Sequence, residues 1–429
     1  MRKIFFFGLS GMVILFLVYF TTGKTFQSSQ IQTGAVRRIQ DSNPAVVKLN
    51  QAGLRYFESK QFEMARDQFK SALELSPNDP TLLNNLAFSQ MEIGKIQGQK
   101  LQLKEAIASF ESAIQINPNI STFHVGAGWA YDKAEQEEKA LQELEEAIRL
   151  NPKEILAYQL LGDIYYKNDN PDKAIEALEK ALALQPDEKS LQQRLAKIKQ
   201  DRNTESKFEK SASFHFTIKF EGEENKEIAQ KVSEILEAAY RDIGSIFYQK
   251  SFRPVIVILY SDKLFRETVH SPSWAGGIYD GKIRIPVQGS AKDPEGLRRI
   301  LYHEYTHAVL FQLTPSPIPT WLNEGLAMYF EGNHSMNNAL QIVDSARREG
   351  RLIPLRRLQG TFMDMDANTS ELAYQESRIA VQNLIDHYSI KRIRDVLERY
   401  RGLDQFASVF EEGFLISYDD YEKSFMAGK

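Results

Sequence analysis

The chain has 429 residues, a formal net charge of −4 and no cysteine. This length is sufficient for two domains of ordinary size. A slightly acidic chain lacks the basic surface that nucleic-acid binding requires, which excludes nucleic acid as a partner. Without cysteine, neither a disulfide bond nor a lipid-modified cysteine anchor can form, so the domains must rely on their hydrophobic cores.

The N-terminal segment combines positive charge with a long apolar run. Arg2 and Lys3 precede seventeen uncharged residues, Ile4 to Phe20. This run is at the short limit for a membrane span and slightly long for a signal-peptide core, and Thr21–Gly23 is a poor cleavage site. We expect residues 1–23 to form an uncleaved signal anchor, with a cleaved signal peptide as the alternative. Because positive residues stay in the cytoplasm, the segment predicts a single-pass protein of the bacterial inner membrane, with most of the chain in the periplasm or at the cell surface.

Internal repetition follows a polar segment. Residues 24–45 are rich in Gln, Ser and Thr and are expected to be a linker. A pattern of an alanine, a large apolar residue, a second alanine and then a proline occurs four times. Its copies are separated by 41, 34 and 34 residues. A helix-pair period of 34 residues is typical of tetratricopeptide repeats. The longer first interval predicts a seven-residue insertion in the second repeat, near Gly94–Lys104. The copies begin at Ala65, Ala106, Ala140 and Ala174.

The repeats predict an all-α solenoid over residues 46–202. Small residues are expected where the two helices of each repeat cross, and a polar capping helix is expected after the last repeat. Such a solenoid presents a concave surface that binds a protein or peptide partner, with a rigid spacer as the alternative. The expected repeats are 46–79, 80–120, 121–154 and 155–188, and the expected first-helix markers are Gly53, Ala87, Gly128 and Gly162.

Residues 203–211 are expected to be a second linker, and a β-rich region follows. Alternating and β-branched patterns predict strands and an intervening helix. The last of these elements is a hairpin with Asp-Gly at its turn. Pro286 suggests that its second strand lies at an edge, because proline donates no hydrogen bond to a neighbouring strand. An exposed edge can bind an extended substrate as an added strand. The alternative is a hairpin with a structural role only, and the two interpretations are compatible. The elements are Phe214–Phe220, residues 226–248, Pro254–Tyr260 and Gly276–Pro286.

An H-E-x-x-H motif follows at residues 303–307. Residues four apart lie on one face of a helix, so His303 and His307 can bind one metal ion, and zinc favours such ligands. Glu304 lies about 100° around the helix, where it can serve as general base toward a water activated by the metal. The alternative is a pair of core histidines with hydrogen-bond partners. Asp293 as N-cap and Pro294 at the first position predict a helix that begins there and continues to Leu313.

A second motif, Trp321–Ala327, places Glu324 seventeen residues beyond His307. Together the two motifs resemble the gluzincin metallopeptidases, a clan that contains thermolysin-like proteases and zinc aminopeptidases. The resemblance covers roughly residues 212–429 and implies an α+β peptidase-MA-like domain. It also implies that the two histidines and Glu324 bind Zn²⁺ and that Glu304 is the base.

The resemblance further implies a tyrosine that stabilises the developing oxyanion. The segment Leu372–Ser377 is similar to the one that carries this tyrosine, so Tyr374 is the candidate, with Tyr329 as its competitor. Thermolysin-like enzymes place an aspartate four residues after the third ligand to orient a histidine, and here that position is Met328. We expect Glu331 to make this contact instead, unless it is a solvated charge at the helix end.

The predicted fold is multi-domain: an all-α tetratricopeptide solenoid followed by an α+β gluzincin-type metallopeptidase domain. The predicted function is a membrane-tethered, extracytoplasmic zinc endopeptidase whose repeats recruit a substrate or partner. Zinc aminopeptidases carry a Gly-x-Met-Glu-Asn phrase that holds the free amine, and Gly276–Asp280 replaces it here, which favours internal cleavage. The alternative is a non-catalytic envelope adaptor whose metallopeptidase-like domain is structural. Glu304 favours the enzyme, because a structural zinc site needs no base.

Overall fold

The computed structural model describes residues 36, 43–99, 102–222, 225–247, 254–269, 276–287, 293–314, 317–332, 336–362, 365–400 and 405–428. The signal anchor expected at 1–23 and most of the linker expected at 24–45 lie outside these residues. Within the described ranges, no helix has both the length and the apolar character that a membrane span requires. The chain divides into two compact units, which meet between Asn203 and Thr204.

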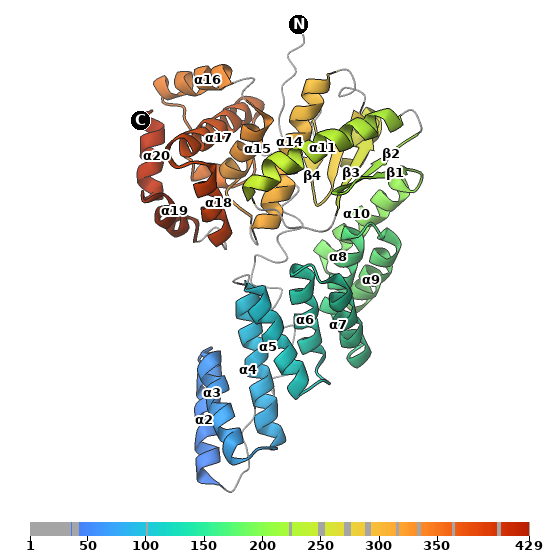
Figure 1. Cartoon of the computed structure of the whole chain (residues 1–429), viewed down its shortest axis with the longest axis vertical. Helices are drawn as coiled ribbons and strands as arrows, with labels where there is room; N and C mark the ends of the chain where they lie inside the picture. The colour runs from blue at the N-terminus through green and yellow to red at the C-terminus, as the bar shows by residue number, and fades with distance from the viewer. Residues whose placement is uncertain are drawn as a thin grey trace. The chain divides into compact units, whose positions relative to one another are not determined.

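The first unit consists of antiparallel helix pairs, as expected for a repeat solenoid (Figure 1). Glycines allow the two helices of a repeat to approach each other closely. A Cβ at Gly128 would lie 2.7 Å from Leu144, and one at Gly162 would lie 2.6 Å from Leu178. The helices are α2 (Pro44–Glu58), α3 (Phe62–Leu75), α4 (Pro80–Gln99), α5 (Leu103–Ile116), α6 (Ser121–Lys133), α7 (Glu137–Leu150), α8 (Ile155–Lys167), α9 (Pro171–Leu184) and α10 (Lys189–Glu205).

The insertion in the second repeat lies in the first half of α4, so the position expected for it was wrong. Fourteen residues of α4 precede Gly94, whereas seven residues of α6 precede Gly128. Gly94, and not Ala87, occupies the crossing position, because a Cβ at Gly94 would lie 3.2 Å from Phe110. Seven residues add about two helical turns and change the direction of a side chain by only ~20°, so the helix keeps its inner face.

Within its described residues, the second unit contains a five-stranded sheet with the strand order β1-β2-β3-β5-β4. Strands β2, β3 and β5 are parallel, whereas β1 and β4 run antiparallel to their neighbours. Strand β1 begins inside the segment expected to be a linker (203–211), and α10 extends into it as well. All four residues of β1 are exposed, so no hydrophobic alternation marked it as a strand. The strands are β1 (Glu209–Ala212), β2 (Phe216–Phe220), β3 (Val255–Tyr260), β4 (Ile278–Tyr279) and β5 (Ile283–Pro286).

The expected hairpin is present, but its edge strand is the first strand and not the second. Strand β4 is the outermost strand and pairs with β5 through Ile278 and Tyr279. Strand β5 also pairs with β3, where Pro286 lies opposite Tyr260. The edge suggested by Pro286 was therefore assigned to the wrong strand, since this proline lies beyond the short stretch that β4 covers.

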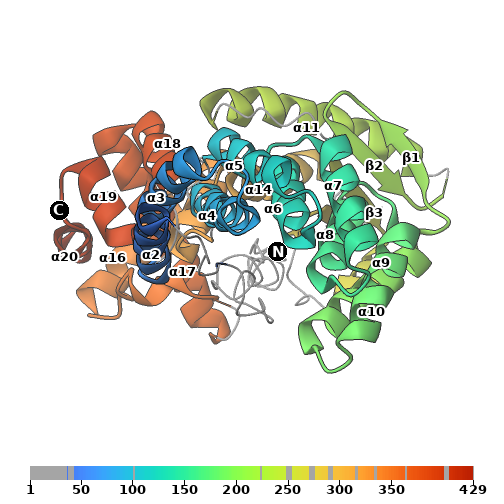
Figure 2. The same ribbon diagram turned by 90° about the horizontal axis from the view of Figure 1, so that it is seen from below.

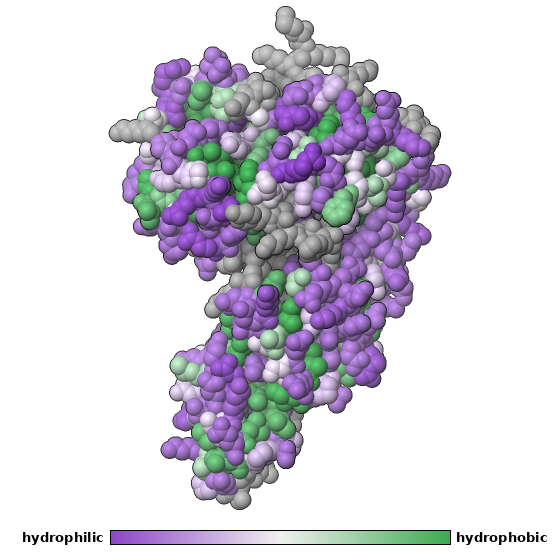
Figure 3. Space-filling view, in the orientation of Figure 1, coloured by the Kyte–Doolittle hydropathy of each residue, from purple (hydrophilic) through white to green (hydrophobic). Residues whose placement is uncertain are grey.

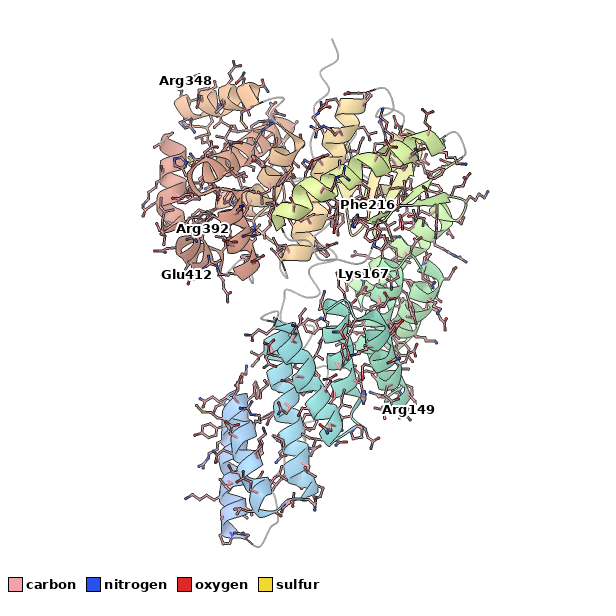
Figure 4. All side chains as sticks on the ribbon, in the orientation of Figure 1. Arg149, Lys167, Phe216, Arg348, Arg392 and Glu412 are labelled. Carbon is pink, nitrogen blue, oxygen red and sulfur yellow. The ribbon has the colours of Figure 1, made fainter. Side chains whose placement is uncertain are left out.

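Helices surround the sheet of the second unit. Helices α16 to α20 lie on one side of α14 and the strands lie on the other, in both Figure 1 and Figure 2. Phe216 of β2, labelled in Figure 4, is fully buried and packs edge-on against Tyr305 of α14, with ring centroids 5.4 Å apart. The drawn face of each unit is mostly hydrophilic (Figure 3). The helices are α11 (Lys226–Phe247), α12 (Asp262–Val269), α14 (Pro294–Leu313), α15 (Thr320–Glu331), α16 (Met336–Arg348), α17 (Ala367–Tyr388), α18 (Ile390–Arg399), α19 (Phe406–Phe414) and α20 (Tyr418–Ala427).

Candidate metal centre

The H-E-x-x-H motif lies on α14, whose start agrees with the sequence prediction. The backbone N–H of Gly296 donates to Oδ1 of Asp293 over 2.9 Å, and Pro294 occupies the first helical turn. The helix is buried along most of its length because α11, α15 and the sheet pack around it. Both histidines of the motif therefore face the interior, with their ring centroids 4.7 Å apart.

Three buried side chains converge at this point. The candidate ligand atoms of His303, His307 and Glu324 all lie within 4.8 Å of one another. Oε2 of Glu324 is 3.5 Å from Nε2 of His303 and 3.8 Å from Nε2 of His307. Among the residues that the structure describes, both Nε2 atoms and both carboxylate oxygens are buried without a hydrogen-bond partner. Four unpaired polar atoms facing one another are unfavourable unless a cation binds between them. Two imidazoles and one carboxylate are a ligand set that fits Zn²⁺ with one position left open.

Helix α15 supplies the third candidate ligand and also orients both histidines. Nδ1 of His303 donates a hydrogen bond to Glu331, the contact expected for this residue. Nδ1 of His307 donates to Oδ1 of Asn323 over 3.1 Å. These bonds leave both Nε2 atoms free to face Glu324. The role of Asn323 was not anticipated from the sequence, although its place directly before the third ligand on the same helix is a usable signal.

The electrostatics of the site reflect its burial. Burial raises the pKa of Glu304 to about 8. Burial and the neighbouring His303 lower the pKa of His307 to about 3. Burial alone would lower the pKa of His303, but contacts with Glu324 and Glu331 raise it. Burial also raises the pKa of Glu324, although His303 opposes this effect. A dry site of this kind favours strong interaction with any cation that enters it.

Glu304 lies beside the segment that leads into the edge strand. Its side chain is buried, and Oε2 has no hydrogen-bond partner within the described part of the chain. A Cβ at Gly277 would lie 2.8 Å from Cδ1 of Ile285 and 3.0 Å from Cγ of Glu304, so glycine permits the backbone to approach Glu304 closely here. The backbone that precedes β4 therefore passes directly against the candidate base.

Tyr374 lies on α17, which packs closely against α15. A Cβ at Gly325 would lie 2.3 Å from the backbone oxygen of Ser377, so this glycine permits the close approach of the two helices. Burial raises the pKa of Tyr374, and the carboxylates of Glu324 and Glu304 raise it further. Tyr374 therefore lies within electrostatic range of both acids. Its competitor Tyr329 is half-buried on α15 and packs against Phe330.

Comparison with protein families agrees with this geometry. Residues 245–421 match the model of the Peptidase MA superfamily. Tetratricopeptide-repeat models match residues 53–94, 89–120, 122–154 and 155–188. The chain joins tetratricopeptide repeats to a peptidase MA domain. The predicted fold class, an all-α solenoid followed by an α+β domain of this superfamily, is thereby confirmed.

Individual relatives cover only parts of the chain. "Uncharacterized protein ycf37" of Pyropia yezoensis is 33% identical over 85 residues, which is 20% of this chain and 44% of that protein. The chain thus matches less than half the length of this relative. MamA from Desulfovibrio magneticus RS-1 is 23% identical and covers 38% of this chain and 88% of its own, with a TM-score of 0.32. The Arabidopsis OM64 TPR domain is 20% identical over 26% of this chain and 93% of its own, with a TM-score of 0.25.

Proposed function

We propose that the chain is a zinc-dependent endopeptidase, tethered to the bacterial cell membrane and facing out of the cytoplasm. The observation that carries this proposal is the buried cluster of His303, His307 and Glu324, whose four unpaired polar atoms face one another beside Glu304. A purely structural zinc site closes all four positions with protein ligands and needs no neighbouring base. Here the described residues offer three candidate ligands and a separate buried carboxylate, Glu304.

The residues have distinct roles in this proposal. Zn²⁺, when bound, supplies a Lewis acid that lowers the pKa of water and polarises the scissile carbonyl. Glu304, a buried carboxylate beside the candidate ligands, takes the proton of the attacking water and returns it to the leaving amine. Tyr374 donates a hydrogen bond to the carbonyl oxygen as negative charge develops on it.

The edge strand β4 supports an extended polypeptide as the substrate. Strand β4 is the outermost strand of the sheet, and the backbone that leads into it passes Glu304. An extended polypeptide can pair with such an edge through its own backbone. Counted from Gly276, Tyr279 stands where the aminopeptidase phrase has its glutamate, and the nearby Asp280 pairs with the buried Arg284. This supports cleavage within a chain over removal of single residues.

The location and the repeats complete the proposal. Arg2, Lys3 and the uncharged run after them support an N-terminal anchor with the peptidase outside the cytoplasm. The repeats support binding of a protein partner, which recruits the substrate or holds the enzyme in an envelope complex. Location can be tested by adding protease to intact spheroplasts, which degrades the chain only if it faces outward.

The catalytic proposal is tested with Glu304→Gln, which removes the base and keeps all three ligands. We expect about one zinc per chain in both proteins, and cleavage of unstructured casein by wild type only. Glu295→Gln, an exposed site on the same helix, is the matched control and should cleave normally. Equal cleavage by wild type and Glu304→Gln would refute the mechanism. A zinc-loaded wild type without activity would favour the adaptor alternative.

A further inference from the structure

A network of buried charges lies on the face of the sheet opposite α14. Side chains of β3 alternate between the two faces: Val257 and Leu259 join the core around α14, whereas Ile258 and Tyr260 join a smaller cluster on the other side. The network occupies this second face, and all its members are buried. They are Glu205, Lys219, Tyr260, Asp280, Lys282 and Arg284.

Arg284 of β5 lies at the centre of the network. Its Nε atom is 3.1 and 3.0 Å from the two carboxylate oxygens of Asp280. Its Nη1 atom donates to Oε1 of Glu205 over 3.2 Å and to the hydroxyl of Tyr260 over 2.5 Å. The side chain is completely buried. A planar guanidinium fixes the direction of its partners, which a flexible ammonium group does not.

One partner of Arg284 belongs to the turn of the β4–β5 hairpin. Asp280 directly follows β4, and its N–H donates to the carbonyl of Lys282 over 3.1 Å. Gly281 completes the turn with a φ of +98°. Strand β4 has only two residues, and so short a strand has little stability of its own. The ion pair between Arg284 and Asp280 therefore holds the end of the strand that leads away from Glu304.

We propose that Arg284 is a positioning residue that fixes the edge strand β4, on which an extended polypeptide substrate pairs beside Glu304. This inference rests on the proposed function and adds a determinant of substrate binding that contacts neither the metal ligands nor the base. Loss of Arg284 leaves Asp280 as a buried carboxylate without this partner, so the turn and β4 move or open. Substrate affinity then falls, whereas the ligand set on α14 and α15 stays intact.

Lys219 provides a matched control within the same network. Its Nζ is 2.5 Å from Oε2 of Glu205, so it shares a carboxylate with Arg284 and is equally buried. It lies on β2, however, and β3 and β5 separate β2 from β4. Arg284→Met and Lys219→Met should both lower the thermal unfolding midpoint, because each removes a partner from a buried charge. Only the first should disturb the edge strand.

The experiment uses the full chain and two measurements. Amide hydrogen exchange is followed at residues 276–287, and binding of fluorescein-labelled casein is measured by anisotropy in the Glu304→Gln background. We expect Arg284→Met to speed exchange and weaken binding by about tenfold each, with unchanged zinc content. Lys219→Met should change both by less than about twofold. Unchanged hairpin exchange in Arg284→Met, or equal loss of binding in the two variants, would overturn the inference.

A further variant covers the case in which Arg284→Met does not fold. Arg284→Lys keeps the charge and loses the planar fork, so it should fold and still weaken casein binding; binding equal to that of the parent would overturn the inference. Different results would overturn the endopeptidase function and the role of Arg284. If zinc-loaded wild type does not cleave casein, the endopeptidase function fails. If the Glu304→Gln protein still binds casein and Arg284→Met weakens that binding, the role of Arg284 stands.

Discussion

Nδ1 of His307 donates a hydrogen bond to Oδ1 of Asn323, the residue directly before the third candidate ligand. Asn323 therefore fixes the tautomer and ring direction of His307 without touching the metal position. We predict that Asn323→Ala weakens zinc binding by about 10–100-fold, measured by competition with a chelator. The control is Asn338→Ala, on an exposed face of α16. An unchanged zinc affinity in Asn323→Ala would mean that packing alone orients His307.

Two matched variants test whether Tyr374 or Tyr329 stabilises the oxyanion. Tyr374→Phe removes only the hydroxyl, and we expect kcat to fall by about 10²–10³-fold, with zinc content unchanged and little change in KM. Tyr329→Phe should retain most of the activity, because its ring is half-buried against Phe330. Steady-state kinetics on a quenched peptide measure both. If Tyr329→Phe lost activity and Tyr374→Phe kept it, the hydroxyl that stabilises the oxyanion would belong to Tyr329.

Gly325 sets the distance between α15 and α17. A Cβ at this position would lie 2.3 Å from the backbone oxygen of Ser377 and 2.4 Å from Val381, so the helices must separate. We expect Gly325→Ala to lower the free energy of unfolding by about 1–3 kcal/mol and to reduce activity as Tyr374 moves away. Gly360→Ala is the control, since a Cβ at Gly360 would meet none of the described residues within 4 Å. Chemical denaturation of both variants measures the difference.

The buried carboxyl group of Glu376 should make the free energy of unfolding depend on pH. It is buried on α17 and accepts the N–H of Ile353 over 3.0 Å. Burial raises its pKa from 4.5 to about 8. The folded chain therefore binds this proton more tightly than the unfolded chain. The resulting stability is fully present below pH 4.5 and is lost as the pH rises to about 8.

Glu376→Gln, which cannot ionise, should remove this loss. Its unfolding free energy relative to wild type should rise by at least about 1 kcal/mol between pH 5 and pH 8. Glu411→Gln, at an exposed position of α19, should follow the wild-type profile. Parallel profiles for Glu376→Gln and wild type would show that Glu376 is ionised throughout this range.

The convergence of His303, His307 and Glu324 was predictable because its signal is local. The spacing of His303 and His307 and the cap at Asp293 lie within one helix, and the motif with Glu324 lies on the next helix. The location of the insertion in α4 could have been read from spacing, because Gly94 lies twelve residues before Ala106, just as Gly128 lies twelve residues before Ala140. It was missed because Ala87, and not Gly94, was expected to be the first-helix marker. Strand β1 was missed because its exposed polar residues carry no alternation.

The long-range contacts could not be read from the chain. Arg284 meets Glu205 across 79 positions, and the pattern of β5 gives no sign that its arginine points into a dry interior. The approach of Tyr374 to Glu324 likewise depends on how α15 packs against α17. Such contacts arise from tertiary packing, whereas propensity and periodicity report only on neighbours along an element.

The length of α4 has a consequence for how a repeat array of this kind can change over evolution. Asn85, in the first half of this helix, donates to Asn50 of α2 over 2.9 Å within a buried contact. Each residue turns a helix by about 100°, so deleting two residues between Asn85 and Gly94 would turn Asn85 about 160° away from its partner. Deleting or adding seven would preserve its direction. Insertions and deletions within this helix should therefore be retained in multiples of seven residues. Insertions or deletions of single residues should occur in the connections between helices.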